Sequence, residues 1–243
     1  MPLTYCVNSH YTYTLVIMTG GYGTRLQNLV PSQPKILAPI KGRPFLYYLL
    51  SWLRSSGTSF DQVILATGHL GEIIQSYVTM NDIQLSVIPE ERPEGTFTAL
   101  LKLIKCINNQ HILVLNGDTV FSVDFADMFS TYLTRQSTLL SLVKCTNTSY
   151  TKGYIVTSDS HAHYVEYTPD YVSLGAFFIS LDILLKYHKL YSKDHKNLML
   201  DKDLLAIEKP IAYILNPDYF IDIGTPQSYK DAQLSIPRIF DQP

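Results

Sequence analysis

The chain has 243 residues, a length that suits one domain, or one domain with a small appendage. Hydrophobic residues make up 46% of it and charged residues 16%, a balance that supports a full globular core and argues against disorder. The formal net charge is −2 and no long basic run occurs, which argues against nucleic acid as the main partner because nucleic-acid-binding domains carry a basic patch.

Apolar strands alternate with amphipathic helices over residues 1–145, the first half of the chain. This alternation is typical of parallel β-α-β units whose sheet is covered by helices on both faces. The apolar runs predict strands at residues 15–18, 62–67, 83–88, 111–115 and 138–144. Helices are predicted at residues 44–57, 71–78, 97–107 and 124–135, with Pro44 opening the first, Gly57 ending it and Asp124 capping the last.

Residues 146–243 have another texture, with short strands joined by short turns. Strands are predicted at residues 153–157, 163–167, 172–180, 211–215 and 219–223. Helices are predicted at residues 183–190, capped by Asp182, at residues 200–208, and from Pro226 onward. We find no internal repeat and no low-complexity segment, and therefore expect a single domain over residues 1–243 that comprises these two halves.

The three cysteines, Cys6, Cys106 and Cys145, are odd in number and widely spaced, with no CxxC pair. Such usage favours a reducing cytoplasm over a disulfide framework or a zinc site. No apolar stretch is long enough to span a bilayer, and residues 1–14 lack the basic start and the apolar core of a signal peptide. The sequence therefore predicts a cytoplasmic protein with no membrane partner.

A glycine-rich loop carries the strongest chemical signal. The first apolar strand opens into three glycines, a threonine and an arginine, and a lysine follows a proline-punctuated loop: Gly20, Gly21, Gly23, Thr24, Arg25 and Lys35. Backbone N–H groups in such a loop form a nest that suits phosphate oxygens. Arg25 would add a forked cation and Lys35 a mobile one. Taken alone, the stretch is equally consistent with a tight turn flanked by two surface cations.

Two familiar phosphate motifs do not fit this loop. A P-loop requires a lysine directly after its glycines, and the dinucleotide fingerprint requires a third glycine where Leu26 stands. The longer pattern, GxGTRL followed by VPxxPKxLxPIxGRPFL, instead resembles the signature of the sugar-phosphate nucleotidylyltransferases. Its GRPFL ending and the later segments are most similar to the heptose 1-phosphate guanylyltransferases, with the mannose 1-phosphate guanylyltransferases next.

The resemblance implies an enzyme that joins a sugar 1-phosphate to a nucleoside triphosphate and releases pyrophosphate. It implies a Rossmann-like α/β fold with a mixed, mostly parallel central sheet flanked by helices, without the β-helical appendage of longer relatives, whose hexapeptide repeats are absent here. The expected substrates are GTP and a heptose or related hexose 1-phosphate, and the expected cofactor is Mg²⁺. The nucleotide-binding residues that it implies are Gly20, Gly21, Gly23, Thr24, Gly95 and Thr96.

Ligands of open α/β sheets gather at the carboxyl ends of the strands, and a second loop leaves such an end at residues 93–100. It resembles the base-recognition loop of the family. Gly95 would let a base pack against the backbone, and Thr96 or Thr98 could bond the polar edge of that base. Without the resemblance, the same residues would read as a loop that ends in a helix N-cap at Thr96.

A third loop places an acidic residue, Asp118, directly after an apolar strand. Carboxylates there suit Mg²⁺, although Asn-Gly and Gly-Asp pairs also occur in ordinary turns. A second aspartate, Asp222, stands between two isoleucines, where burial is costly unless it is paired or metal-bound, and where it could equally point to solvent. The resemblance implies that Asp118 and Asp222 jointly hold the metal, and that Gly117, Glu166 and Gly175 contact the sugar.

The implied mechanism follows from charge. A sugar 1-phosphate has a second pKa of about 6, so it is largely a dianion at pH 7 and needs no general base. Its oxygen attacks the α-phosphorus in line, and catalysis consists of positioning and electrostatic stabilisation. Arg25 would stabilise the leaving pyrophosphate, Lys35 the charge at the α-phosphate, and Asp118 would act through the metal.

The second half departs from the family pattern. No lysine follows Glu166 through Ser180. Just beyond, the family tends to have Asn-Gly-Gly or Asn-Ala-Gly, which holds sugar hydroxyls, whereas this chain has Ser-Leu-Gly-Ala at residues 173–176, and Leu174 cannot replace the hydrogen bonds of an asparagine. Three explanations compete: an unusual acceptor sugar, another cation such as Lys152 or Lys144, or a catalytically silent regulatory paralogue that binds nucleotide-sugar. Retention of Arg25, Lys35, Asp118 and Asp222 together favours an enzyme.

Other readings differ in substrate or assembly. The same reaction with another nucleoside triphosphate, of the mannose 1-phosphate, uridylyl or thymidylyl type, remains an alternative because guanine is inferred only from the resemblance. A glycosyltransferase would carry an Asp-x-Asp motif at a strand end, and none is found there. The 18 tyrosines would suit the face of a homodimer as well as a core.

Overall fold

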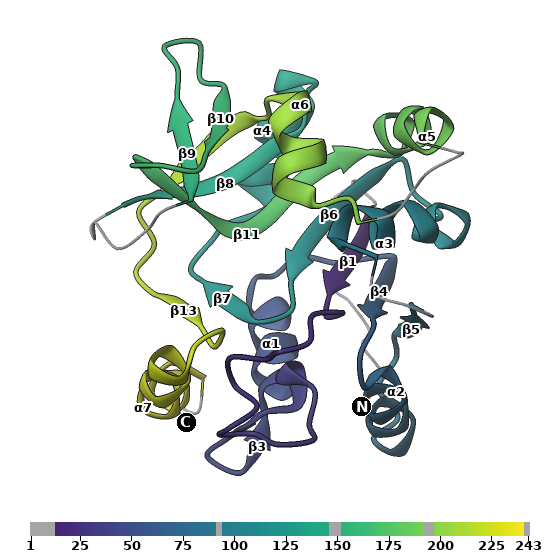
Figure 1. Ribbon diagram of the computed structural model, residues 1–243, viewed down its shortest axis with the longest axis vertical. Helices are drawn as coiled ribbons and strands as arrows, with labels where there is room; N and C mark the ends of the chain where they lie inside the picture. The colour runs from purple at the N-terminus through teal and green to yellow at the C-terminus, as the bar shows by residue number, and fades with distance from the viewer. Residues whose placement is uncertain (1–12, 91–93, 146–151, 192–196, 241–243) are drawn as a thin grey trace.

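The computed structural model describes residues 13–90, 94–145, 152–191 and 197–240. Within these ranges, nine strands form a central sheet in the order β10-β9-β11-β6-β1-β4-β5, with β8 paired to β11 and β12 paired to β8 (Figure 1). The first-half strands β1 (Thr14–Met18), β4 (Gln62–Thr67), β5 (Ser86–Pro89) and β6 (His111–Asn116) run parallel to one another.

The second half extends this sheet mainly with antiparallel strands. The long strand β11 (Tyr171–Ser180) pairs antiparallel with β6, and it also pairs with β8 (Leu139–Lys144) and β9 (Gly153–Val156). The outer strands are β10 (Ala162–Val165), antiparallel to β9, and β12 (Ile211–Leu215), parallel to β8. The predicted α/β fold with a mixed sheet flanked by helices is therefore confirmed.

Helices cover both faces of the sheet, as the alternating pattern predicted. Side chains alternate along β1, so Leu15 and Ile17 belong to one buried cluster and Val16 to the other. The first cluster packs against α1 (Phe45–Ser55), α2 (Gly71–Met80), α4 (Phe125–Arg135) and α7 (Pro226–Phe240). The second packs against α3 (Thr96–Lys102), α5 (Leu181–Leu190) and the π-helix η3 (Leu200–Leu205), which continues into α6 (Ala206–Glu208).

Several predicted boundaries change in the structure. Asp124 caps α4 as predicted, because its carboxylate accepts from the backbone N–H groups of Ala126 and Asp127. The prediction that Asp182 caps the next helix is wrong: Ser180 is the N-cap, and its hydroxyl accepts from the N–H of Ile183. Residues 83–85 lie outside the strand predicted from residue 83. The helix predicted to reach residue 107 ends at Lys102 and continues as the 3₁₀ turn η2 (Leu103–Cys106).

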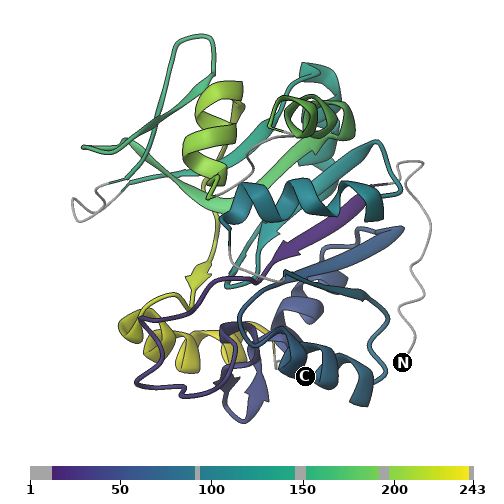
Figure 2. The same ribbon diagram turned by 45° about the vertical axis from the view of Figure 1, so that its right-hand side comes forward.

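Two small sheets lie outside the main one. β2 (Pro39–Ile40) pairs with β3 (Arg43–Pro44), and β7 (Thr119–Phe121) pairs antiparallel with β13 (Phe220–Asp222). The strand predicted near residues 219–223 therefore joins β7 rather than the central sheet. Next to it, α7 lies against the segment that carries the 3₁₀ turn η1 (Lys35–Leu37), the yellow helix beside the purple chain in Figures 1 and 2.

Two further sequence expectations concern cysteines and membranes. Cys106 and Cys145 are free thiols, and Cys6 lies outside the described residues. Among the helices that the structure describes, none is long and apolar enough to cross a bilayer.

Candidate active site

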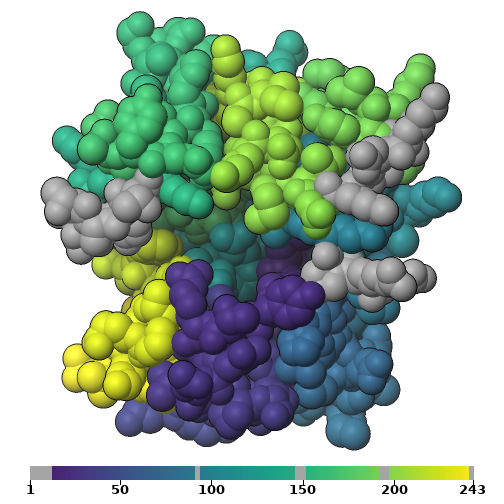
Figure 3. Space-filling model, in the orientation of Figure 1, coloured from purple at the N-terminus to yellow at the C-terminus, as the bar shows by residue number. Residues whose placement is uncertain are grey.

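A cavity of about 780 Å³ opens at the carboxyl ends of the parallel strands β1, β4, β5 and β6. Figure 3 shows the surface hollowed between the purple N-terminal segment and the green segments above it. Of the residues singled out in the sequence, those that line this cavity are Gly20, Gly21, Lys35, Gly95, Thr96, Gly117 and Asp118. The other predicted site residues, Gly23, Thr24, Arg25, Glu166, Gly175 and Asp222, are not part of its lining.

The glycine-rich loop is shaped by close contact with the loop after β4. Thr19 donates both its N–H and its hydroxyl to the carbonyl of Ala66, at 2.8 and 2.9 Å. A Cβ at Gly68 would lie 2.8 Å from the carbonyl oxygen of Gly20, so the two loops approach as closely as glycine permits. Gly23 has a φ of +61°, and its carbonyl accepts from the N–H of Leu26, which closes a turn that contains Thr24 and Arg25.

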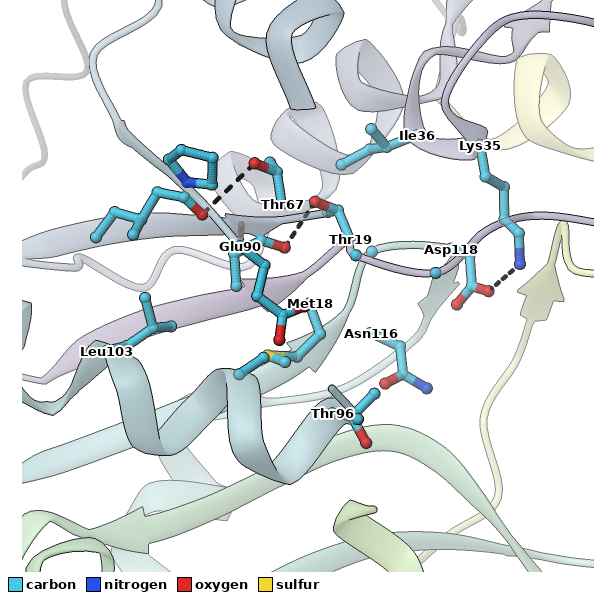
Figure 4. Close-up of a pocket in the computed structure, with 18 of the residues that line it drawn as sticks. Met18, Thr19, Lys35, Ile36, Thr67, Glu90, Thr96, Leu103, Asn116 and Asp118 are labelled. Carbon is cyan, nitrogen blue, oxygen red and sulfur yellow. Dashed lines mark hydrogen bonds and ion pairs between the residues drawn. The ribbon is translucent and has the colours of Figure 1, made fainter. Parts of the chain in front are cut away.

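Lys35 and Asp118 are brought together although 83 residues separate them. The Nζ of Lys35 lies 2.7 Å from Oδ2 of Asp118, and both side chains are about a quarter exposed or less (20% and 26%). Lys35 begins the turn η1, whose next residues, Ile36 and Leu37, are buried and anchor it. Figure 4 shows this pair at one side of the cavity, apart from Glu90 at the other.

Asp222 joins this group through the pairing of β13 with β7. Its register places Asp222 opposite Thr119, and the N–H of Ile223 donates to the backbone carbonyl of Asp118 at 3.0 Å. Burial, followed by the negative charge of Asp118, raises the pKa of Asp222, while the Gly224 N–H and the charges of Lys35 and Arg25 act to lower it. Arg25, itself exposed, therefore lies close enough to act on the acidic pair.

The acidic pair, Asp118 and Asp222, has the kind of ligands that a magnesium ion prefers. Mg²⁺ is usually held by one or two carboxylates, with the remaining positions filled by water and substrate phosphates. Two neighbouring carboxylates, one with a raised pKa, match this description because a divalent cation would relieve their repulsion. In the described part of the chain, no group of three or more His, Cys, Asp or Glu side chains is placed to hold a metal ion by itself. A metal at the acidic pair would therefore need further ligands from water or phosphate.

The opposite end of the cavity carries a carboxylate that the sequence analysis did not single out. Glu90 directly follows β5, and its N–H donates to the carbonyl of Thr67 at 2.6 Å. Its Oε1 atom is buried and has no hydrogen-bond partner among the described residues. Burial raises the pKa of Glu90, and the N–H of Glu94 and the charge of Lys102 partly offset this. Its position at the end of a strand was the available signal.

The loop at residues 95–98 is arranged differently from the sequence prediction. Gly95, with a φ of +94°, is the N-cap of α3, so Thr96 is not the cap but the first helical residue. Thr98 is fully buried and is not part of the cavity lining, so it cannot bond a base as suggested. The hydroxyls of both threonines instead accept backbone N–H groups: Thr98 from Leu198 at 3.2 Å and Thr96 from Leu200 at 3.1 Å.

Gly117 and Gly175 act as points of close packing. A Cβ at Gly117 would lie 2.6 Å from the methyl group of Thr19, and its N–H donates to the carbonyl of Met18. Gly175 has a φ of +80° in an irregular stretch of β11, and a Cβ there would lie 2.7 Å from Nδ2 of Asn116. Asn116 itself lines the cavity, a position the sequence analysis did not assign.

Glu166 lies outside the cavity in a cluster of charges. It forms an ion pair with Lys202, from η3, and a longer one of 3.8 Å with Lys152. The hydroxyl of Tyr164 lies 3.4 Å from the same carboxylate oxygen. Lys152, one of the two lysines proposed from the sequence, is thus near Glu166. Lys202 was not among them, because it is far along the chain from Glu166. Leu174 is fully buried in the core.

Comparisons with known proteins agree with this geometry. The family model described as nucleotidyl transferase matches residues 14–238. The chain is 31% identical over 224 residues to the D-glycero-alpha-D-manno-heptose 1-phosphate guanylyltransferase of Aneurinibacillus thermoaerophilus, covering 90% of this chain and 96% of that protein. It is 29% identical over 221 residues to the protein of the same name from Campylobacter jejuni, covering 88% and 96%.

A solved structure gives the same answer for the fold. HddC from Yersinia pseudotuberculosis, complexed with GMP-PN, superposes with a TM-score of 0.77 at 27% identity, covering 91% of this chain and 98% of that one. The match of the family model to nearly the whole chain, together with relatives matched over nearly their full length, shows the ancestry of this protein. The chain belongs to the nucleotidyl transferase family.

Proposed function

We propose that the protein transfers GMP from GTP to a sugar 1-phosphate, a heptose or related hexose, and releases pyrophosphate. One observation carries this proposal: a single cavity has a cationic and acidic cluster suited to phosphates at one end and a half-buried carboxylate, Glu90, suited to guanine at the other. The names of the relatives, which are guanylyltransferases, support the same choice.

The phosphate end accounts for the transfer step. An oxygen of the sugar phosphate forms a bond to the α-phosphorus of GTP while the bond from that phosphorus to the β-phosphate bridge breaks, so pyrophosphate carries away the electron pair. Lys35 would place a positive charge at the reacting phosphates, and Arg25, whose charge acts on Asp222, would stabilise the charge that the leaving pyrophosphate gains. Asp118 and Asp222 would hold Mg²⁺, which supplies further neutralisation of the phosphate charges when bound.

The base end accounts for the choice of nucleotide. Guanine presents two neighbouring donors, N1–H and the N2 amino group, on its Watson–Crick edge, and an ionised carboxylate is acceptor-only and can receive both. Glu90 lines the cavity directly after β5 and is only half-buried. Uracil and thymine present one N–H between two carbonyls, and adenine presents an acceptor at N1. A carboxylate therefore favours guanine over the other bases.

We infer that the acceptor sugar binds beside Asn116 and Gly175, with Glu166 and its lysines at the edge of that site. Lys202 would supply the positive charge that the sequence lacks after Glu166, because it reaches the same carboxylate from another element. Free thiols at Cys106 and Cys145 fit a cytoplasmic location, where both substrates would be found. A homodimer stays a prediction.

A second candidate, a catalytically silent sensor of nucleotide-sugar, rests on the departures around Leu174 and Glu166. The two candidates are separated by measuring pyrophosphate release with Mg²⁺ for each nucleoside triphosphate against a panel of sugar 1-phosphates. We expect release that requires GTP and one sugar phosphate, that collapses in Asp118→Asn, and that persists in Asp231→Asn, an exposed control on α7. Tight nucleotide binding without release for any pair would favour the sensor.

A further inference from the structure

We propose that Met199, from the second half of the chain, forms one wall of the nucleobase site and helps to determine which nucleotide binds. This inference rests on the proposed function, in which the base occupies the end of the cavity near Glu90. Met199 lines that cavity and is 44% exposed.

The segment that carries Met199 is fastened to the start of α3 on both sides of the methionine. On one side, the carbonyl of Leu198 accepts from the N–H of Phe97 at 2.9 Å, and the Leu198 N–H donates to Thr98. On the other side, the Leu200 N–H donates to Thr96. These contacts join residues that are about a hundred positions apart in the sequence, so they fix the position of Met199 relative to the base loop.

Gly95 lets this segment come so close. A Cβ at Gly95 would collide with the carbonyl oxygen of Leu198, and the residue has a φ of +94°, which side chains rarely adopt. Glycine at this position therefore makes room for protein backbone. The sequence alone suggested that this space would be occupied by the base. The wall of the base site is completed by the segment that Gly95 admits, and Met199 is the residue of that segment that faces the cavity.

A second set of contacts joins the segment to η3 and β9. The carboxylate of Asp203 accepts from the Met199 N–H at 2.6 Å, and the hydroxyl of Tyr154 donates to Asp201. The backbone of Met199 is thus held between α3 and η3, and the residue lines the cavity. A polarizable thioether makes favourable contacts with aromatic rings and adapts to their outline, which suits a purine surface. Met18, Ile88 and Leu103 supply further apolar lining in the same cavity.

The test compares binding of GTP with binding of inorganic tripolyphosphate, which carries the phosphates and no base. Both would be titrated calorimetrically into the full chain with Mg²⁺ for wild type, Met199→Ala and Met80→Ala, the last a methionine that is 84% exposed on α2. We expect Met199→Ala to weaken GTP about fivefold to tenfold, the size of a sulfur–aromatic contact, with tripolyphosphate unchanged. Met80→Ala should change neither.

A second pair of variants tests how the wall is held. Thr98→Val keeps the shape of the side chain and removes the acceptor of the Leu198 N–H, so it should weaken GTP in the same direction as Met199→Ala. Thr98→Ser keeps a hydroxyl and should restore binding. Melting temperatures would be recorded for both, so that a loss confined to GTP is separated from general unfolding, which would also weaken tripolyphosphate.

The outcomes separate this inference from the proposed function. If wild type binds GTP more tightly than tripolyphosphate and Met199→Ala leaves that difference intact, the inference is overturned and the function stands. If Met199→Ala raises only the KM of the sugar 1-phosphate, Met199 belongs to the acceptor site and the inference is again overturned. If another nucleoside triphosphate binds best, the assignment of Glu90 to guanine is wrong. The effect of Met199→Ala is then measured on the binding of that nucleotide relative to tripolyphosphate. If no nucleotide exceeds tripolyphosphate, both fail.

Discussion

Replacing Glu90 by glutamine is the sharpest test of nucleotide choice, because the change keeps the size of the side chain and alters only its hydrogen-bonding character. The carboxylate can accept from both guanine donors, whereas an amide accepts from one and turns its own donor towards the other. The variant therefore loses one charge-assisted hydrogen bond and places two donors face to face. For uracil the same amide is complementary, since it accepts from the ring N–H and donates to a neighbouring carbonyl.

The expected magnitude follows from the lost bond. A hydrogen bond to a charged group is worth about 1.5 to 3 kcal/mol, so kcat/KM for GTP should fall roughly 10- to 150-fold in Glu90→Gln. The value of kcat/KM for UTP should stay unchanged or rise, so the preference for GTP over UTP becomes smaller or is reversed. The variant should still fold. Burial raises the pKa of Glu90, which means that the folded state disfavours the ionised carboxylate. At neutral pH the carboxylate therefore lowers stability, and replacing it by the neutral amide should raise the melting temperature.

The assay is the initial rate of pyrophosphate release at saturating sugar 1-phosphate, with GTP and UTP varied separately. Glu72→Gln, an exposed glutamate in the first turn of α2, is the matched control and should leave both constants unchanged. An unchanged ratio of kcat/KM for GTP over UTP in Glu90→Gln would falsify the assignment of Glu90 to the base. A parallel loss for both nucleotides would instead place Glu90 in support of the cavity wall.

The remaining predictions address pH, phosphate charge, the acceptor and the fold. Because the pKa of Glu90 is raised, the KM for GTP should begin to rise, as pH falls, at a pH above the usual range of glutamate, and Glu90→Gln should lack this limb in a pH profile. Lys35→Met should lower kcat about 10²- to 10³-fold in the same release assay, and a smaller loss would argue against contact with the reacting phosphates. Lys202→Met should raise the KM for sugar 1-phosphate while Lys144→Met does not; equal effects would remove Lys202 from the acceptor site. Gly95→Ala should cost about 2 kcal/mol or more in urea unfolding, against little for Gly21→Ala, whose Cβ would meet nothing.

The sequence predicted those features that depend on local pattern. Buried strands such as β1 and β4 are short apolar runs, and their alternation with helices is enough to indicate the parallel half of the sheet. Helix N-caps were harder to predict. Asp124 was predicted correctly, whereas the N-cap of α5 is Ser180, two positions before the predicted Asp182, because serine and aspartate side chains both accept backbone N–H groups well.

Features that depend on contacts between distant segments were not predictable. Thr98 is in a suitable loop for base recognition, yet its hydroxyl is taken by Leu198, a hundred positions away. Lys202 meets Glu166 from another element, so a search for a lysine just after Glu166 could not find it. Glu90 belongs to no motif, and its place directly after β5 was the only signal in the sequence; its buried, unpartnered Oε1 atom is visible only in the structure. The roles assigned to Arg25, Lys35, Asp118 and Asp222 stay predictions, although the structure brings them together.

The pairing of β7 with β13 has a consequence for the order in which the protein becomes active. Asp118 and Asp222 lie 104 positions apart in the sequence, so the second carboxylate is synthesised well after the first. The parallel strands and the glycine-rich loop can assemble before then. If the two aspartates hold the metal as proposed, a chain that stops between them would keep the parallel strands and the glycine-rich loop but lack the second carboxylate. We expect such a chain to bind nucleotide phosphates without turning them over, because the catalytic group is complete only when β13 has paired with β7.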